Sequence, residues 1–92
     1  MKDYLPIGSI VRLSGGTKRV MIFGRRIVHS ASGTVFDYTS CLYPEGFMDI
    51  DNCFLFNHER IEEVYHLGFQ DEEELAFSTG PLQTVSTPPT EG

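Results

Sequence analysis

Two apolar segments joined by a glycine turn constrain the fold of this chain more than any other feature of its sequence. The segments run from Gly8 to Leu13 and from Arg19 to Gly24, and Ser14-Gly15-Gly16-Thr17 lies between them. Glycine supplies the positive φ that tight hairpin turns need. The pattern therefore predicts an antiparallel β-hairpin. The second segment is almost continuously apolar, which predicts that both of its faces are covered.

Further short strands are predicted after the hairpin. They span Thr34 to Cys41, Cys53 to Phe56, and part of Glu62 to Phe69, with a helical turn expected at Asn57 to Arg60 because Asn is a good N-cap. The predicted fold class is mainly β (α+β), as a small curved antiparallel sheet or an SH3-like, partly open barrel with one short C-terminal helix. Closing such a sheet removes edges that invite aggregation.

The C-terminal helix has a clear start signal. Asp71 fits the N-cap position, Glu74 lies three residues later as in a capping box, and Gly80-Pro81 ends the pattern. The residues that follow have too few apolar side chains to offset the entropy of ordering them. We therefore predict one folded domain over residues 1–80 and a disordered C-terminal tail over residues 81–92.

Length and charge narrow the class of function. A chain of 92 residues has room for one domain. Its net charge of −6 repels phosphate backbones and disfavours a nucleic-acid partner. The longest apolar stretch, Val20 to Phe23, is too short to cross a bilayer, and no basic N-terminus leads into a long apolar run. We expect a soluble, cytoplasmic protein without membrane insertion.

The metal-ligating residue types do not form a metal-binding pattern. Cys41 and Cys53 are the only cysteines, and the histidines are His29, His58 and His66. Zinc sites usually show paired ligands at close spacing, and no such pair occurs here. The two cysteines are predicted to be reduced, buried residues of strands, and neither a metal nor a cofactor is expected.

Catalysis is not indicated either. His58 could act with Glu59 or Cys53, but proximity in sequence does not supply the oriented third group that a nucleophile and base require. No nucleophile-elbow or phosphate-loop motif is present. We therefore predict no catalytic residues and a protein that is not an enzyme.

The charges are distributed unevenly along the chain. Six of the seven Lys and Arg residues precede residue 27, whereas acids dominate from Asp37 onward. The two regions could attract each other within the fold, or steer a partner, or do both. Aromatic side chains beside a rigid proline turn often anchor interfaces. The predicted protein-binding residues are Lys18, Arg19, Tyr43, Pro44, Glu45, Gly46 and Phe47, with inward packing of Tyr43 left open and the acidic helix start at Asp71 to Glu74 as the next candidate.

Five segments of the chain resemble a known family. They are Leu5-Pro6-Ile7-Gly8-Ser9-Ile10-Val11, the run from Lys18 to Arg25, Phe36-Asp37-Tyr38, the run from Cys41 to Gly46, and Phe56-Asn57-His58-Glu59. The chain is similar, from about Leu5 to Phe77, to the domain-of-unknown-function family 4176. Its most specific features are the Tyr-Pro-Glu-Gly and Phe-Asn-His-Glu segments.

The resemblance implies a role in protein export. Members of that family occur in Gram-positive bacteria, encoded beside type VII secretion components and large LXG-type toxins. It implies a non-enzymatic cytosolic accessory or chaperone-like protein that binds a cognate LXG-type toxin or the type VII secretion ATPase to assist export. Two alternatives stay open: an immunity protein that neutralises a toxin domain, and a small-barrel nucleic-acid-binding module. The oligomeric state is not predicted.

Overall fold

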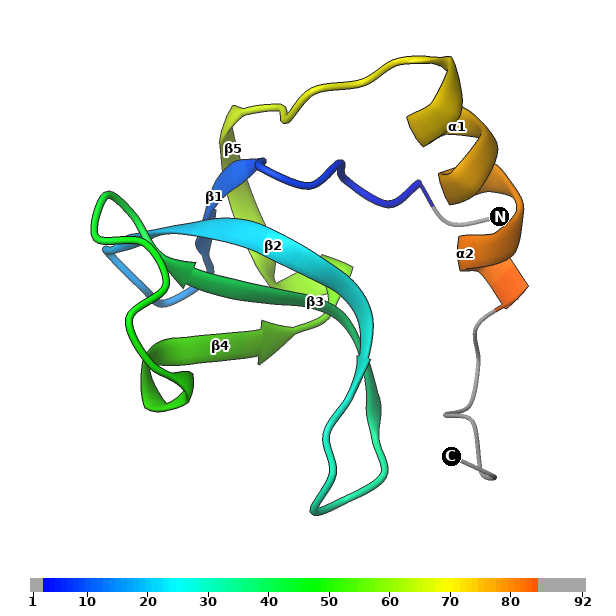
Figure 1. Cartoon of the computed structure of the whole chain (residues 1–92). Coiled ribbons are helices and arrows are strands. Elements are labelled where there is room, and N and C mark those ends of the chain that lie inside the picture. Colours follow the sequence, from blue (N-terminus) through cyan, green and yellow to red (C-terminus); the bar gives the residue numbers. More distant parts are fainter. Residues whose placement is uncertain (1–2, 85–92) are drawn as a thin grey trace.

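The computed structural model describes residues 3–84, which form one five-stranded antiparallel sheet and a C-terminal helical segment (Figure 1). The strands are β1 (Ile10–Leu13), β2 (Arg19–Val28), β3 (Val35–Leu42), β4 (Cys53–Phe56) and β5 (Ile61–His66). The helices are the 3-10 turns η1 (Ile50–Asn52) and η2 (His58–Arg60), followed by α1 (Glu72–Thr79) and α2 (Pro81–Thr84). The predicted fold class and the predicted hairpin are confirmed.

The order of the strands requires the sheet to curve. The order is β4-β3-β2-β1-β5, so the two edge strands are consecutive in the chain and only η2 joins them. Five flat strands would hold the edges about 19 Å apart, at about 4.8 Å per strand. A 3-10 turn advances only about 2 Å per residue. The sheet therefore curls until β4 and β5 approach each other, although no described residues of these strands pair.

The core lies on the inner side of this curved sheet. The buried apolar side chains are Tyr4, Val11, Val20, Ile22, Tyr38, Phe56 and Leu82, and they form one cluster. They come from β1, β2, β3 and β4, from the N-terminal segment and from α2. Burying these aromatic rings removes a large apolar area from water, which a domain of this size needs.

The prediction that β2 is covered on both faces is wrong. Val20 and Ile22 are buried, but Phe23 is exposed. Alternation along the strand puts Phe23 on the face opposite Val20 and Ile22, and a register shift between Ile22 and Gly24 leaves it as the extra residue of a bulge. Gly24 is required there, because a Cβ at this position would lie 2.6 Å from the Thr39 methyl carbon.

The predicted end of the folded domain is also corrected. Residues 81–84 form α2 rather than a disordered tail, and Leu82 is buried in the core. Proline is tolerated in the first turn of a helix, where its missing N–H is not needed. The remaining residues of the predicted tail, 85–92, lie outside the described part of the chain.

A buried hydrogen-bond network closes the curved sheet at the end of β4. The Tyr38 side chain is fully buried, and its hydroxyl accepts a hydrogen bond from the Leu5 N–H at 2.9 Å and lies 2.7 Å from His58 Nδ1. The Asp37 N–H donates to Asn57 Oδ1 at 3.0 Å, and Asp37 Oδ2 accepts from the His58 N–H at 2.9 Å. Asn57 therefore binds β3 instead of capping η2 with its side chain. The network holds the N-terminal segment, β3 and η2 together.

An ion pair fastens α1 to the sheet. Arg25 of β2 binds Glu74 through two hydrogen bonds of 2.8 and 2.9 Å, and the two side chains are only 6% and 15% exposed. The guanidinium also lies 5.6 Å from the centre of the Phe77 ring. Asp71 is the predicted N-cap, because its Oδ1 accepts from the Glu74 N–H at 2.9 Å. In a full capping box the Glu74 carboxylate would also accept from the Asp71 N–H. Here it binds Arg25 instead.

Removing the Glu74 carboxylate is expected to destabilise the protein strongly. In Glu74→Ala the buried Arg25 guanidinium loses its counter-charge, and breaking such a pair costs about 3–5 kcal/mol. We expect the free energy of unfolding, measured by urea denaturation, to fall by roughly this amount. Glu73→Ala removes an exposed carboxylate one residue away, and we expect it to change the free energy of unfolding by less than about 0.5 kcal/mol. Equal losses in the two variants would contradict this role of the ion pair.

The buried Tyr38 hydroxyl gives a pH signature. Burial raises the pKa of Tyr38 from 10.0 to about 12, because the phenolate is disfavoured away from water. The neutral phenol is therefore favoured in the folded state. Its contribution to the stability of the fold is complete below pH 10 and is lost as the pH rises through about 12. We expect the free energy of unfolding of the wild type to fall across this interval.

Two phenylalanine variants test this assignment. Tyr38→Phe leaves the Leu5 N–H without its partner, which costs about 1–3 kcal/mol of stability at neutral pH. The variant is also expected to lose less stability between pH 10 and 12 than the wild type, and we call this loss the alkaline decline. Tyr65→Phe loses only an exposed hydrogen bond from Arg12 and should retain the full decline. An unchanged alkaline decline in Tyr38→Phe, measured by urea denaturation at several pH values, would refute the assignment.

Candidate protein-binding surface

The structure brings most of the predicted binding residues together. The turn from Tyr43 to Gly46 follows β3 and lies beside the β1–β2 hairpin. Lys18 Nζ is 2.9 Å from Glu45 Oε1, and the Tyr43 N–H donates to the Arg19 carbonyl at 3.0 Å. The two predicted segments therefore form one continuous surface.

Arg19 organises the aromatic part of this surface. Its guanidinium carbon lies 5.7 Å from the centre of the Tyr43 ring and 5.3 Å from the centre of the Tyr65 ring. These distances are within the range of cation–π attraction. Tyr43 is exposed, so it contacts Arg19 at the surface and does not pack into the core. Tyr65 of β5 was not among the predicted residues.

A backbone hydrogen bond closes the turn. The Tyr43–Pro44 peptide bond is cis, and the Gly46 φ of 84° lies in the left-handed region that favours glycine. The Gly46 N–H donates to the Leu42 carbonyl at 2.7 Å. The hydrogen bond from Lys18 lowers the pKa of Glu45, but both side chains are nearly half exposed. Such an exposed ion pair contributes little to stability and leaves the turn open to a partner.

Phe47, the last predicted binding residue, directly follows the Tyr43–Gly46 turn. It packs edge-on against Phe23, with ring centres 5.7 Å apart, and remains 62% exposed. Ile50 and Phe54 are also exposed. We call Phe23, Phe47, Ile50 and Phe54 the Phe47 patch, because all four side chains line the same groove. An exposed patch of this kind on a small protein is typical of an interaction site.

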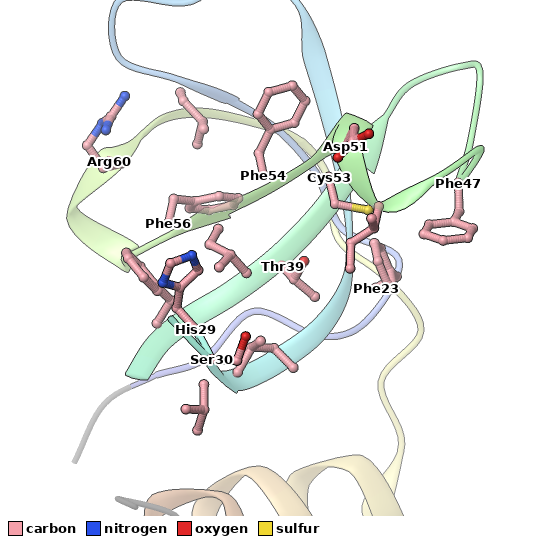
Figure 2. Close-up of a pocket in the computed structure, with 16 residues that line it drawn as sticks. Phe23, His29, Ser30, Thr39, Phe47, Asp51, Cys53, Phe54, Phe56 and Arg60 are labelled. Atoms are coloured by element: carbon pink, nitrogen blue, oxygen red, sulfur yellow. The ribbon is translucent and has the colours of Figure 1, made fainter. Parts of the chain in front are cut away.

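The groove beside the Phe47 patch has a volume of about 930 Å³. Figure 2 shows Phe23, Phe47 and Asp51 at one end and His29 and Arg60 at the other, with β4 running between them. Its walls come from β2, the β2–β3 connection, β3, the segment before β4, and β4, with Leu13 of β1 and Arg60 of η2. The groove is thus mainly apolar along its length and carries opposite charges at its two ends.

The two cysteines lie directly opposite each other on β3 and β4. Both thiols are free, but only Cys41 is buried. Cys53 is partly exposed and lines the groove, so the prediction that both are buried is wrong for Cys53. Its partial burial raises its pKa, with smaller contributions from Cys41 and Asp49, which favours the neutral thiol. Cys53 therefore adds a weakly polar surface to the groove.

The candidate catalytic side chains are bound to different partners. His58 contacts Tyr38 and Asp37 in the buried network, whereas Cys53 Sγ lies 3.6 Å from the Asp49 carbonyl oxygen. Within residues 3–84, no group of three or more His, Cys, Asp and Glu side chains is arranged to hold a metal ion. None of the described helices is long and apolar enough to span a bilayer.

Acidic side chains face most of the hairpin cations. Arg12 lies 3.2 Å from both Glu62 and Glu63, and Lys18 and Arg25 have the acidic partners described above. The attraction expected between the basic and acidic regions is therefore formed within the fold. These contacts reduce the positive potential that a nucleic-acid backbone would need.

Comparison with known proteins supports one family. No curated protein and no solved structure matches the chain. A family model described as a domain of unknown function (DUF4176) matches residues 4–77, which is more than half of the chain. The Tyr-Pro-Glu-Gly segment of the resemblance contacts the hairpin through Glu45 and Lys18, and the Phe-Asn-His-Glu segment lies in the Tyr38 network. The chain therefore belongs to the family of domains of unknown function DUF4176.

Proposed function

We propose that this protein is a non-enzymatic, cytoplasmic accessory or chaperone-like protein that binds a partner protein through the groove. The observation that carries the proposal is the exposure of Phe47 at one end of a mainly apolar groove. A large apolar side chain left in water forgoes the stabilisation of burial, and a partner that covers it restores this stabilisation. The partner proposed, an LXG-type toxin or the type VII secretion ATPase, is the one that the resemblance of the sequence implies.

The surroundings of the groove support binding to a protein. Aromatic residues are enriched among the side chains that dominate interface energies, and a polar rim commonly surrounds them. Phe47 and Phe23 would be the aromatic anchors, and the nearby Lys18–Glu45 pair with Arg19 would form part of the rim. The turn that precedes Phe47 is held by backbone hydrogen bonds, so presenting the anchor costs little conformational entropy.

Truncation of Phe47 tests the proposal. The full chain is co-purified with the toxin encoded beside it and with the secretion ATPase, and affinity is measured for whichever forms a complex. Phe47→Ala is expected to weaken binding by about 30-fold, the effect of losing a hot spot of about 2 kcal/mol. Its unfolding midpoint should stay near that of the wild type, because the side chain is largely exposed.

The matched control removes an exposed apolar side chain elsewhere. Leu75 lies on α1, is exposed and does not line the groove, so Leu75→Ala is expected to retain wild-type affinity. Equal affinities of Phe47→Ala and the wild type would rule out the groove as the binding site. If the chain rescues cells from the toxic domain while export is unaffected, the immunity role replaces the accessory role.

Reversal of the hairpin charges is expected to change the rate of association. In Lys18→Glu with Arg19→Glu, the pair with Glu45 becomes repulsive and the rim loses its two cations. Rim charges act mainly on the association rate, so we expect a slower rate with a smaller effect on dissociation. Surface plasmon resonance at low and high salt distinguishes the two steps. A change in the dissociation rate alone would place these residues in the centre of the interface.

A further inference from the structure

A second exposed apolar surface lies where the connection between β5 and α1 crosses the N-terminal segment. Phe69 is 81% exposed, and together with Ile7 and Phe77 it lines a shallow hollow of about 460 Å³. The other residues that line the hollow are acidic: Asp71, Glu73 and Glu74. We call Ile7, Phe69 and Phe77 the Phe69 platform. It is distinct from the Phe47 patch, with which it shares no residue.

The backbone beneath the Phe69 platform is fixed. The Gly68 N–H donates to Ser9 Oγ at 3.1 Å, and this hydroxyl donates to the Pro6 carbonyl at 2.7 Å. Ser9 is fully buried, and a Cβ at Gly68 would overlap the Ile7 carbonyl oxygen, at 1.9 Å. The two segments therefore cross in direct contact, which holds Phe69 outward. Because the backbone beside Phe69 is already fixed, covering Phe69 costs little further backbone entropy.

The unpaired charge beside the Phe69 platform is negative. Glu74 is neutralised by Arg25, and Asp71 caps α1, but no cation pairs with Glu72 or Glu73 among residues 3–84. This charge repels the phosphates of nucleic acids and of anionic membranes. It attracts lysine and arginine side chains, and these can also lie over an exposed aromatic ring.

We propose that the Phe69 platform docks a cationic amphipathic segment of a partner protein. An apolar side chain of that segment covers Phe69 and Phe77, and its lysine or arginine side chains face Glu73 at the edge of the hollow. This occupant matches both properties of the surface, its apolar centre and its acidic edge. The inference does not depend on the groove. If both surfaces are used, the protein can hold two partner segments at once.

A synthetic amphipathic peptide of leucine, phenylalanine and lysine tests this inference on the full chain. We expect fluorescence anisotropy to show binding that weakens as the salt concentration rises, because screening reduces the charge attraction. Phe69→Ala is expected to weaken the affinity at least about tenfold. Glu73→Gln should weaken it by about two- to fivefold and reduce its salt dependence. The same peptide with glutamate in place of lysine should not bind.

Two controls make the outcome decisive. Leu75→Ala removes an exposed apolar side chain from α1 that does not line the hollow, and Phe47→Ala alters only the groove, so both should bind the peptide like the wild type. Circular dichroism checks that Phe69→Ala remains folded. Undiminished binding by Phe69→Ala, equal binding of the acidic peptide, or no binding at low salt would overturn the inference. Loss of binding in Phe47→Ala would overturn it as well, because the peptide would then occupy the groove.

Discussion

The hydrogen bonds of the buried Tyr38 hydroxyl hold together parts of the chain that no strand pairing connects. The sheet is open between β4 and β5, so the N-terminal segment and η2 depend on side-chain contacts at this end. A polar oxygen buried in an apolar core is costly unless it is hydrogen-bonded, and here it has Leu5 and His58 as partners. The same segment that Leu5 begins continues to Ser9, which supports Gly68 and hence the orientation of Phe69. One buried hydroxyl thus contributes to the position of the Phe69 platform.

The two most specific segments of the family resemblance have separate physical roles. Phe-Asn-His-Glu supplies Asn57 and His58, whose hydrogen bonds to Asp37 and Tyr38 close the curved sheet. Tyr-Pro-Glu-Gly forms an exposed turn that contacts the hairpin and precedes Phe47. The first segment is therefore part of the scaffold, and the second is the place where the scaffold presents side chains to solvent. This division supports assigning function to the surface around the groove rather than to the histidine.

Local signals explain which parts of the fold could be predicted from the sequence. The glycine turn, the N-cap Asp71 and the 3-10 turn after Asn57 each depend on a few neighbouring residues, and each is observed. Phe23 lies on the face of β2 opposite Val20 and Ile22, and a continuous apolar run does not reveal that this face is left exposed. Leu82 stands in a locally polar segment, yet it is buried in the core, and hydrogen bonds of Gln83 to the Ser78 and Gly80 carbonyls help to hold α2.

The candidate surfaces could be predicted only in part, because they combine local features with contacts between distant segments of the chain. The hairpin cations and the aromatic proline turn could be chosen from their residue types, but the Lys18–Glu45 contact that joins them is seen only in the folded chain. The groove is assembled from segments far apart in the chain, and its residues have no common spacing. The pairing of Arg25 with Glu74 likewise joins residues whose local sequence predicts only a strand and a helix start. Such contacts depend on the curvature of the sheet.

The central claim is that a rigid scaffold presents the groove to a partner protein. Amide hydrogen exchange tests it most directly, measured on the chain alone and on the chain bound to its partner. Binding at the groove predicts new protection of backbone amides at residues 47–56, where exposed side chains line its wall. The Asp37 and His58 amides, which are hydrogen-bonded in the network, should exchange slowly in both states. Fast exchange of these network amides in the free chain, or new protection that spares residues 47–56, would contradict the account.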